Sequence, residues 1–215
     1  MKIVDPDTWE PPPLLDSANG GIRGALGGTQ LLRRPEHAAF REAIERFVAE
    51  PGPLILEVGF DHGMVLLESA RQNPGIRWLG CEVRRARVEA AAPHAPPNAL
   101  LVRADGRTLL EDLLPPGRLL GVLVLFPSPS NDPRHVLLTP QVLGHIRRVL
   151  APEGRLVLAT DVPGMARLVE PLLADWPEAE PLPLAPVLSR RERVCRRDGR
   201  RIWRFIRGPG ACILR

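Results

Sequence analysis

Residues 54–63 read LILEVGFDHG, an apolar run that contains one acid, Glu57, and is followed by two glycines. The run has the length of a buried β-strand, and the glycines lead into a helical pattern over 64–72. A strand that passes through a glycine turn into a helix is typical of open α/β sheets, which present backbone N–H groups to a ligand at that point. The stretch therefore predicts a ligand-binding α/β fold.

The rest of the chain continues the alternation of apolar runs and helical patterns. Apolar runs of strand length lie at 76–82, 99–103, 120–126 and 155–160, with a further strand candidate at 201–206. Helical patterns lie at 36–50, 84–92, 106–114, 140–150 and from 161 to about 176. Strands that are apolar on both faces and joined by helices predict a parallel sheet with right-handed crossovers.

Length and composition predict one domain with an appendage. The chain has 215 residues, 44% of them hydrophobic, which is enough for a single compact core. Residues 1–34 contain EPPP, NGG and LGG without apolar periodicity, so we expect an irregular arm outside the core and a single domain over 35–215. Because no apolar run has the length of a membrane span or a signal peptide, we expect a cytoplasmic protein without a membrane segment.

The positive charge is concentrated near the end of the chain. The formal net charge is +4, and the segment 189–207 contains nine arginines and two acids. A concentrated basic surface favours a nucleic acid as partner, whereas the alternative is an edge strand kept soluble by its arginines. The three cysteines and five histidines show no metal-ligand spacing, so we expect no metal.

Three acids follow the same pattern at three successive predicted strands. Glu57, Glu82 and Asp105 lie at the carboxyl ends of these strands, and Glu82 comes 23 residues after Gly59. That interval is close to the one at which open α/β folds bind a ribose diol with an acid. The pattern predicts a nucleoside cofactor, and the alternative is that the acids only cap helices.

Six segments, in order, resemble the bacterial tRNA (guanine-N7) methyltransferase family: LEVGFDHG, GCEV, RADG, LFPSPSNDPRH, LAPEGRLVLATD and the late SRRE. They lie within about residues 33–206. The resemblance implies a Rossmann-like seven-stranded class I methyltransferase fold, S-adenosylmethionine as cofactor and tRNA as partner. It implies cofactor contacts for Glu57, Gly59, Gly63, Glu82 and Asp105. It implies substrate contacts for Asp132, Arg134, Asp161, Ser189, Arg190, Arg191 and Glu192.

Two loops depart from the family's pattern. Where the family has GFGxG, this chain has Asp61 at the second glycine, and we expect Asp to tolerate the unusual backbone angles needed there. Where the family has FPDPWPKKRH, this chain reads FPSPSNDPRH over 126–135, so Ser128 stands at the acid's position and is the catalytic candidate. Asp132 replaces a lysine, which reverses a charge expected to face RNA.

These observations predict an S-adenosylmethionine-dependent methyltransferase that acts on guanine N7 of tRNA. Because N7 is an unprotonated acceptor, its methylation requires no prior removal of a proton, and the loss of the family's acid endangers specificity more than chemistry. Two alternatives remain open: a diverged methyltransferase with another substrate, and a non-catalytic RNA-binding relative. We expect a monomer or a homodimer.

Overall fold

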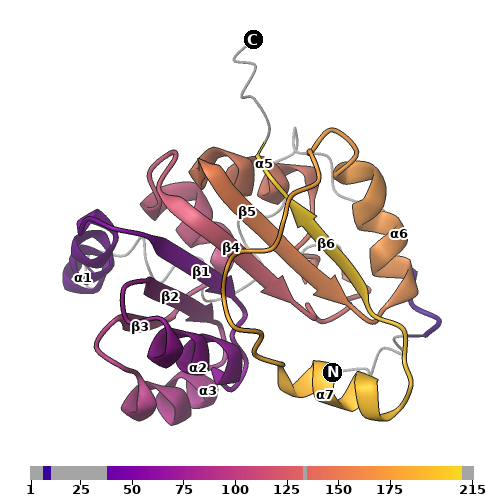
Figure 1. Cartoon of the computed structure of the whole chain (residues 1–215), viewed down its shortest axis with the longest axis horizontal. Helices are drawn as coiled ribbons and strands as arrows, with labels where there is room; N and C mark the ends of the chain where they lie inside the picture. The colour runs from indigo at the N-terminus through magenta and orange to yellow at the C-terminus, as the bar shows by residue number, and fades with distance from the viewer. Residues whose placement is uncertain (1–6, 11–37, 133–134, 210–215) are drawn as a thin grey trace.

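A computed structural model describes residues 7–10, 38–132 and 135–209. Their centre is a six-stranded sheet in the order β3-β2-β1-β4-β5-β6 (Figure 1). The strands are β1 (Leu54–Val58), β2 (Arg77–Glu82), β3 (Ala99–Arg103), β4 (Leu119–Leu125), β5 (Leu150–Thr160) and β6 (Trp203–Arg207). The first five strands are parallel, and β6 pairs antiparallel with β5. The predicted parallel α/β sheet is confirmed.

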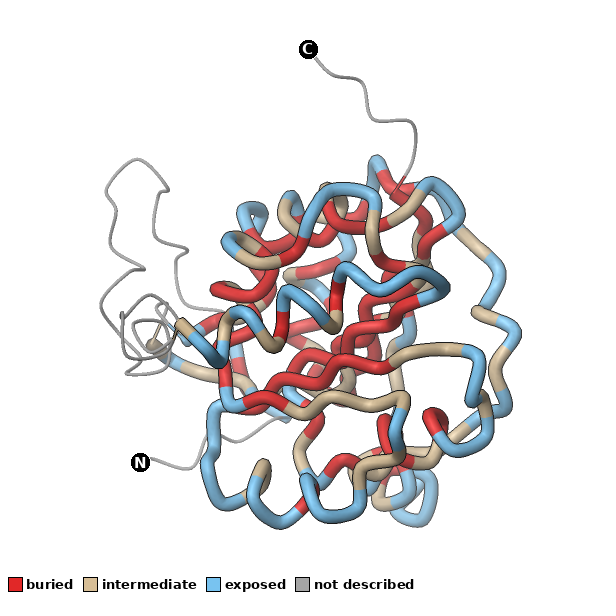
Figure 2. Tube along the Cα trace, turned by 90° about the vertical axis from the view of Figure 1, so that its left-hand side faces the viewer, coloured by how far each residue is buried: buried red, intermediate tan, exposed pale blue. Residues whose placement is uncertain are grey.

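Helices cover both faces of the sheet because successive strand residues point to opposite sides. On one face, α1 (Ala38–Ala49), α5 (Pro140–Val149) and α6 (Pro163–Leu172) pack against Leu54, Leu56 and their neighbours. On the other face, α2 (Met64–Gln72) and the end of α3 (Arg85–Ala91) pack against Ile55 and Trp78. Figure 2 shows the resulting buried interior, with exposed residues on the outer sides of the helices.

The strand order reverses between β1 and β4, and this reversal sets the position of the site. From β1 the chain builds outward through β2 to β3, then returns to add β4 on the opposite side of β1. The connection after β1 therefore runs toward one edge of the sheet and the connection after β4 toward the other. This divergence opens a crevice beyond the carboxyl ends of the two strands. Open α/β sheets bind their ligands in such a crevice.

Three elements differ from the sequence-based expectations. The described residues form six strands, whereas the family resemblance implied seven. The helix expected over 106–114 is divided into α4 (Gly106–Thr108) and a π-helical turn, η5 (Leu109–Leu113); a short 3-10 turn, η4 (Ala92–His94), follows α3. The basic segment forms a helix, α7 (Arg190–Arg197), followed by the edge strand β6, so the edge strand of the alternative interpretation accounts for only part of it.

The N-terminal arm is described only at residues 7–10, and there it departs from expectation. Trp9 is 3% exposed and belongs to the core, so the prediction that the arm lies outside the core is wrong for this residue. Its indole N–H donates to the Ser130 carbonyl oxygen at 3.2 Å. The Trp9 carbonyl oxygen lies where a Cβ at position 164 would be. The N-terminal segment can therefore pack here only because residue 164 is a glycine. The rest of the arm, at 11–34, lies outside the described residues.

Within the described residues, none of the helices is long and apolar enough to span a bilayer. The longest of them, α1, has 12 residues, and a bilayer crossing needs about 20.

Candidate active site

A cavity of about 600 Å³ opens beyond the carboxyl ends of β1, β2, β3 and β4. Among the predicted site residues, it is lined by Glu57, Gly59, Glu82, Asp105, Ser128, Asp161, Ser189, Arg190 and Arg191. Gly63, Asp132 and Glu192 lie outside its lining, and Arg134 falls outside the described residues. Residues from distant parts of the chain therefore form one site, as expected for acids at adjacent parallel strand ends.

Every second residue of the glycine loop after β1 has a left-handed backbone conformation. Gly59, Asp61 and Gly63 have φ angles of 75°, 52° and 74°. Asp61 therefore adopts the conformation that the sequence analysis expected an aspartate to tolerate. A Cβ at Gly59 would meet no atom within 4 Å, so its bare backbone faces open space at the cavity wall.

Glu57 is a buried acid without a complete set of partners. Its side chain accepts a hydrogen bond from the Leu66 backbone N–H, and its Oε2 has no partner among the described residues. Burial raises the pKa of this carboxyl to about 8, the Leu66 hydrogen bond lowers it and the nearby Asp61 charge raises it further. At neutral pH Glu57 is therefore mainly protonated and can donate a hydrogen bond into the cavity.

Glu82 and Asp105 are buried carboxylates that contact the first turns of the helices after them. Glu82 Oε1 accepts the Arg84 backbone N–H at 2.9 Å. Asp105 caps α4 by accepting the Arg107 N–H at 2.9 Å, and Arg107 Nη2 lies 2.6 Å from Asp105 Oδ2. The helix-capping alternative is therefore confirmed for Asp105, but capping and ligand binding are compatible because both acids also line the cavity.

Asp61 and Glu82 share an arginine that the sequence analysis did not identify. Arg87, on α3, forms an ion pair with Asp61 Oδ1, and the same Nη1 atom lies 3.7 Å from Glu82 Oε2. All three side chains line the cavity. The carboxylate introduced by Asp61 is therefore neutralised by the protein itself.

The loop after β4 enters the site through a sharp turn. Phe126 has a φ of 51°, an uncommon conformation for a bulky residue that is often found at functional sites. The turn brings Pro127 and Ser128 to the cavity. Asp132 lies farther along the loop, and its Oδ2 is 3.8 Å from Nδ1 of His135, which lines the cavity.

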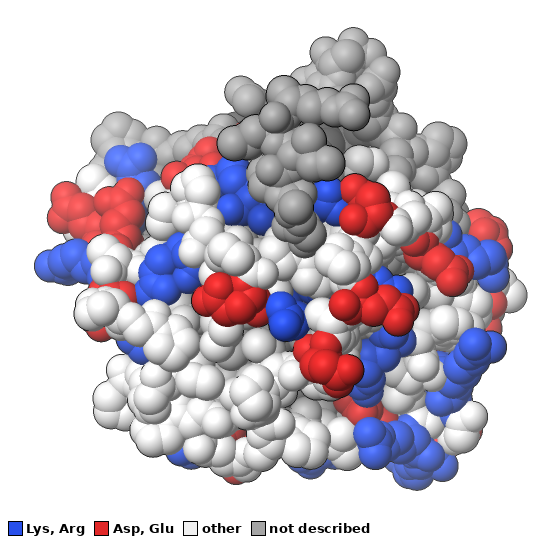
Figure 3. Space-filling view, turned by 45° about the horizontal axis from the view of Figure 1, so that its top comes forward, with Lys and Arg blue, Asp and Glu red and all other residues white. Residues whose placement is uncertain are grey.

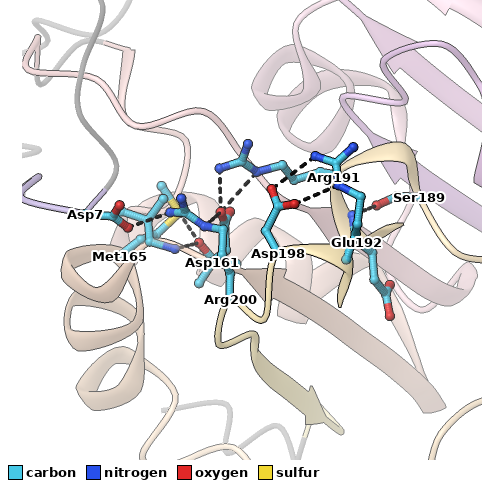
Figure 4. A network of polar contacts seen from close by, with 11 residues as sticks. Asp7, Asp161, Met165, Ser189, Arg191, Glu192, Asp198 and Arg200 are labelled. Atoms are coloured by element: carbon cyan, nitrogen blue, oxygen red, sulfur yellow. Dashed lines mark hydrogen bonds and ion pairs between the residues drawn. The ribbon is translucent and has the colours of Figure 1, made fainter. Parts of the chain in front are cut away.

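Asp161, at the end of β5, is the centre of an arginine network (Figure 4). Its Oδ2 accepts from Arg191 Nε at 3.0 Å and Nη2 at 2.5 Å, and Arg200 Nε lies 3.3 Å away. Arg200 also contacts Asp7 at 2.5 Å, which ties the N-terminal segment to the site. The hydrogen bonds that Arg191 donates to the Asp161 carboxylate raise the pKa of Arg191. In this wall of the cavity, Arg191 is therefore held in a fixed ion pair with Asp161.

Ser189 and Glu192 have structural roles at the start of α7. The Ser189 hydroxyl accepts the Glu192 N–H at 3.1 Å and caps the helix. Glu192 is 5% exposed, and its Oε1 accepts hydrogen bonds from Arg196 and Arg204, both at 2.8 Å. These contacts fix α7 against β6.

The residues present fit the cofactor that the sequence implies. Three acids and the bare backbone of Gly59 line a single cavity, and Glu57 Oε2 still lacks a partner. Hydroxyl and amino groups satisfy such oxygens, and S-adenosylmethionine carries both kinds of group. The described residues contain no cluster of metal-ligating side chains. Burial raises the pKa of the Cys81 thiol in the cavity wall to about 12, so this thiol stays neutral.

Sequence reasoning missed Arg87, Arg107 and the N-terminal segment. Arg107 follows Asp105 at the spacing of a first-turn helix residue, so its position could have been inferred. Arg87 lies five residues beyond Glu82, on the helix that the same analysis expected. Trp9 gave no signal, because its contact with Ser130 joins positions 121 residues apart.

Comparisons with known proteins agree with this geometry. A family model described as "Putative methyltransferase" matches residues 51–204. A tRNA (guanine-N(7)-)-methyltransferase of Chromohalobacter salexigens is 29% identical over 77% of this chain and 75% of that protein. The enzyme of the same name from Alkalilimnicola ehrlichii is 37% identical over 64% of this chain and 60% of that protein. The crystal structure of the aminoglycoside resistance methyltransferase NpmB1 shares the fold, with a TM-score of 0.53 and 20% identity over 78% of this chain and 92% of that chain.

Proposed function

The chain belongs to the family described as "Putative methyltransferase", and from this premise we propose that it methylates guanine N7 of tRNA in the cytoplasm. It is an S-adenosylmethionine-dependent methyltransferase with a class I, Rossmann-like fold. The relatives reported above are named for guanine N7 of tRNA, and the substrate is therefore carried over to this chain as a proposal. The observation that carries it is the single cavity that joins the three strand-end acids to the loop after β4 and to α7.

On the cofactor side, we assign Glu82 to the ribose hydroxyls and Asp105 and Glu57 to the remaining polar groups. The support is that these three acidic side chains are buried and line the cavity beside the bare backbone of Gly59. When bound, S-adenosylmethionine supplies an electrophilic methyl group. The protein's task is then to hold both reactants in line, which can lower the barrier by roughly 7–11 kcal/mol.

On the substrate side, we assign the contact with the target base to Ser128. Its hydroxyl can both donate and accept a hydrogen bond, whereas a carboxylate would only accept from the guanine N–H groups. Because N7 carries no proton, the site needs no general base. Asp161 acts through Arg191, which it holds at the cavity wall, and Glu192 acts by fixing α7.

A second candidate is methylation of a different substrate, and one observation favours it. The two acids expected on the substrate side, Asp161 and Glu192, are both bonded to arginines. Of the two arginines that line this part of the cavity, Arg191 pairs with Asp161, whereas Arg190 forms no ion pair with another described residue. A target with an anionic group beside the methylated atom would match this wall.

Incubation with labelled methyl donor and total small RNA, followed by nucleoside analysis, distinguishes the candidates. The proposal predicts label in 7-methylguanosine from the tRNA fraction. Label in another nucleoside would support the diverged methyltransferase. Absence of label in RNA, together with measured cofactor binding and RNA binding, would support the non-catalytic relative.

We expect the RNA surface to include two exposed arginines of α7, Arg190 and Arg193. Neither forms an ion pair with another described residue, whereas Arg196 pairs with Glu192 and Arg197 with Asp198. On the face that the top of Figure 1 presents, acidic and basic side chains are interspersed (Figure 3). The described side chains visible in Figure 3 therefore form no single basic patch, whereas Arg190 and Arg193 lie on one helix.

Replacing Arg190 and Arg193 together by alanine is expected to reduce the salt slope of tRNA binding by about two units, because each phosphate contact contributes about 0.9. The double variant at Arg85 and Arg197 removes the same charge and is the matched control. Its slope should change by less than one unit, because these guanidinium groups already neutralise Glu89 and Asp198. Binding is measured between about 50 and 200 mM salt. Equal changes in both variants would contradict this assignment.

A further inference from the structure

One arginine joins the two acids at the mouth of the cofactor cavity. Arg87 projects from α3, Asp61 lies in the glycine loop after β1, and Glu82 ends β2. The Nη1 atom of Arg87 bonds Asp61 and lies 3.7 Å from Glu82. The exposed fractions of the side chains are 42% for Asp61, 28% for Arg87 and 6% for Glu82, so the contact runs from the rim to the interior.

The other groups around these acids do not replace the guanidinium. His62 Nε2 lies 3.9 Å from Asp61 Oδ2, at the exposed side of the loop. The Arg84 backbone N–H binds the other Glu82 oxygen. Behind the loop, the charge of Asp61 already raises the pKa of Glu57. Without Arg87, the charges of Asp61 and Glu82 would therefore both lie beside the protonated Glu57, and His62 would be the remaining ion-pair partner of Asp61 among the described residues.

Loss of the Arg87 guanidinium would change the geometry of the glycine loop as well as the charge balance around it. Asp61 has a φ of 52°, a left-handed conformation that aspartate adopts more readily than most non-glycine residues but that is still uncommon. The ion pair with Arg87 ties this residue to α3. Repulsion between Asp61 and Glu82 would move the loop, the Glu82 carboxylate or both.

We propose that Arg87 is a positioning residue for the cofactor, which holds Asp61 and Glu82 together so that Glu82 can bind the ribose. Arg87 thereby makes an aspartate compatible with the glycine loop of this site. The inference rests on cofactor binding alone and does not depend on which RNA or other substrate is methylated.

The test is calorimetry of S-adenosylhomocysteine binding to four forms of the full chain. Arg87→Ala should weaken binding about tenfold, which corresponds to about 1.4 kcal/mol. Adding Asp61→Asn should restore most of the affinity, because it removes the repulsion that Arg87 otherwise cancels. Arg85→Ala is the matched control: Arg85 lies on the same helix, is exposed and pairs with Glu89, and it should bind like the wild type.

A second ligand separates positioning from direct contact. Adenosine has the ribose but lacks the amino-acid part, so Arg87→Ala should weaken adenosine and S-adenosylhomocysteine by the same factor. Unchanged binding by Arg87→Ala, failure of Asp61→Asn to restore it, or a loss confined to S-adenosylhomocysteine would each overturn the proposal. Failure of the wild type to bind either ligand would instead contradict the cofactor assignment itself. Thermal melting of each variant confirms that it is folded.

Discussion

The free energy of unfolding of the cofactor-free protein is expected to fall as the pH rises from about 5 to about 8, because Glu57 ionises more easily in the unfolded chain. The Glu57→Gln variant is expected not to show this fall. Burial raises the pKa of Glu57 from 4.5 to about 8 in the folded state. Below pH 4.5 the carboxyl is protonated in both folded and unfolded chains, so it imposes no penalty there. As the pH rises, the unfolded chain ionises first and is increasingly favoured, until the folded carboxyl ionises near pH 8.

This difference in pKa between the folded and unfolded chains lowers the free energy of unfolding by on the order of 3–5 kcal/mol at pH 8 and above. Chemical denaturation of wild type and Glu57→Gln at a series of pH values measures it. Glu68→Gln is the control, because Glu68 lies on α2, next to the Glu57 contact, but is 46% exposed. Parallel stability curves for wild type and Glu57→Gln would contradict a protonated Glu57.

Glu82→Ala is expected to weaken S-adenosylhomocysteine binding by about a hundredfold or more. Hydrogen bonds to a charged group contribute about 1.5–3 kcal/mol each, and a carboxylate at this position can accept both ribose hydroxyls. The buried position of Glu82 and its place in the cavity wall support this assignment. Calorimetry at one pH and salt concentration measures the loss.

Glu89→Ala is the matched control for Glu82→Ala. Glu89 lies on α3, is 58% exposed and pairs with Arg85, so its removal should leave affinity unchanged. A similar loss in both variants would indicate a general electrostatic effect. Unchanged affinity in Glu82→Ala would contradict the ribose assignment and leave Glu82 with only its structural contacts to Arg84 and Arg87.

The parallel sheet and the cofactor side of the cavity could be predicted because local patterns determine them. Apolar runs bounded by turns defined the strands, and adjacent parallel strands bring their carboxyl ends together. Glu57, Glu82 and Asp105 therefore had to meet once the strand order was known. Their arginine partners could not be predicted in the same way, since long side chains reach several acids and sequence spacing does not choose among them.

The helix α7 was missed because its sequence is dominated by arginine and offers few apolar positions for a periodic pattern. Val194 and Cys195 are its only apolar residues. A local signal was nevertheless present: Ser189 followed three residues later by Glu192 is typical of a helix N-terminus. The family resemblance interpreted the same residues as a substrate motif, and the structure shows that Ser189 caps the helix.

Methylation of matched tRNA transcripts, one made with guanosine and one with 7-deazaguanosine, tests the central claim most directly. The second transcript carries a C–H group in place of N7 and therefore cannot accept a methyl group there. The proposed function predicts transfer of label to the guanosine transcript, recovered as 7-methylguanosine, and none to the 7-deaza transcript. Equal labelling of both transcripts, or none of either by protein that binds S-adenosylhomocysteine, would contradict it.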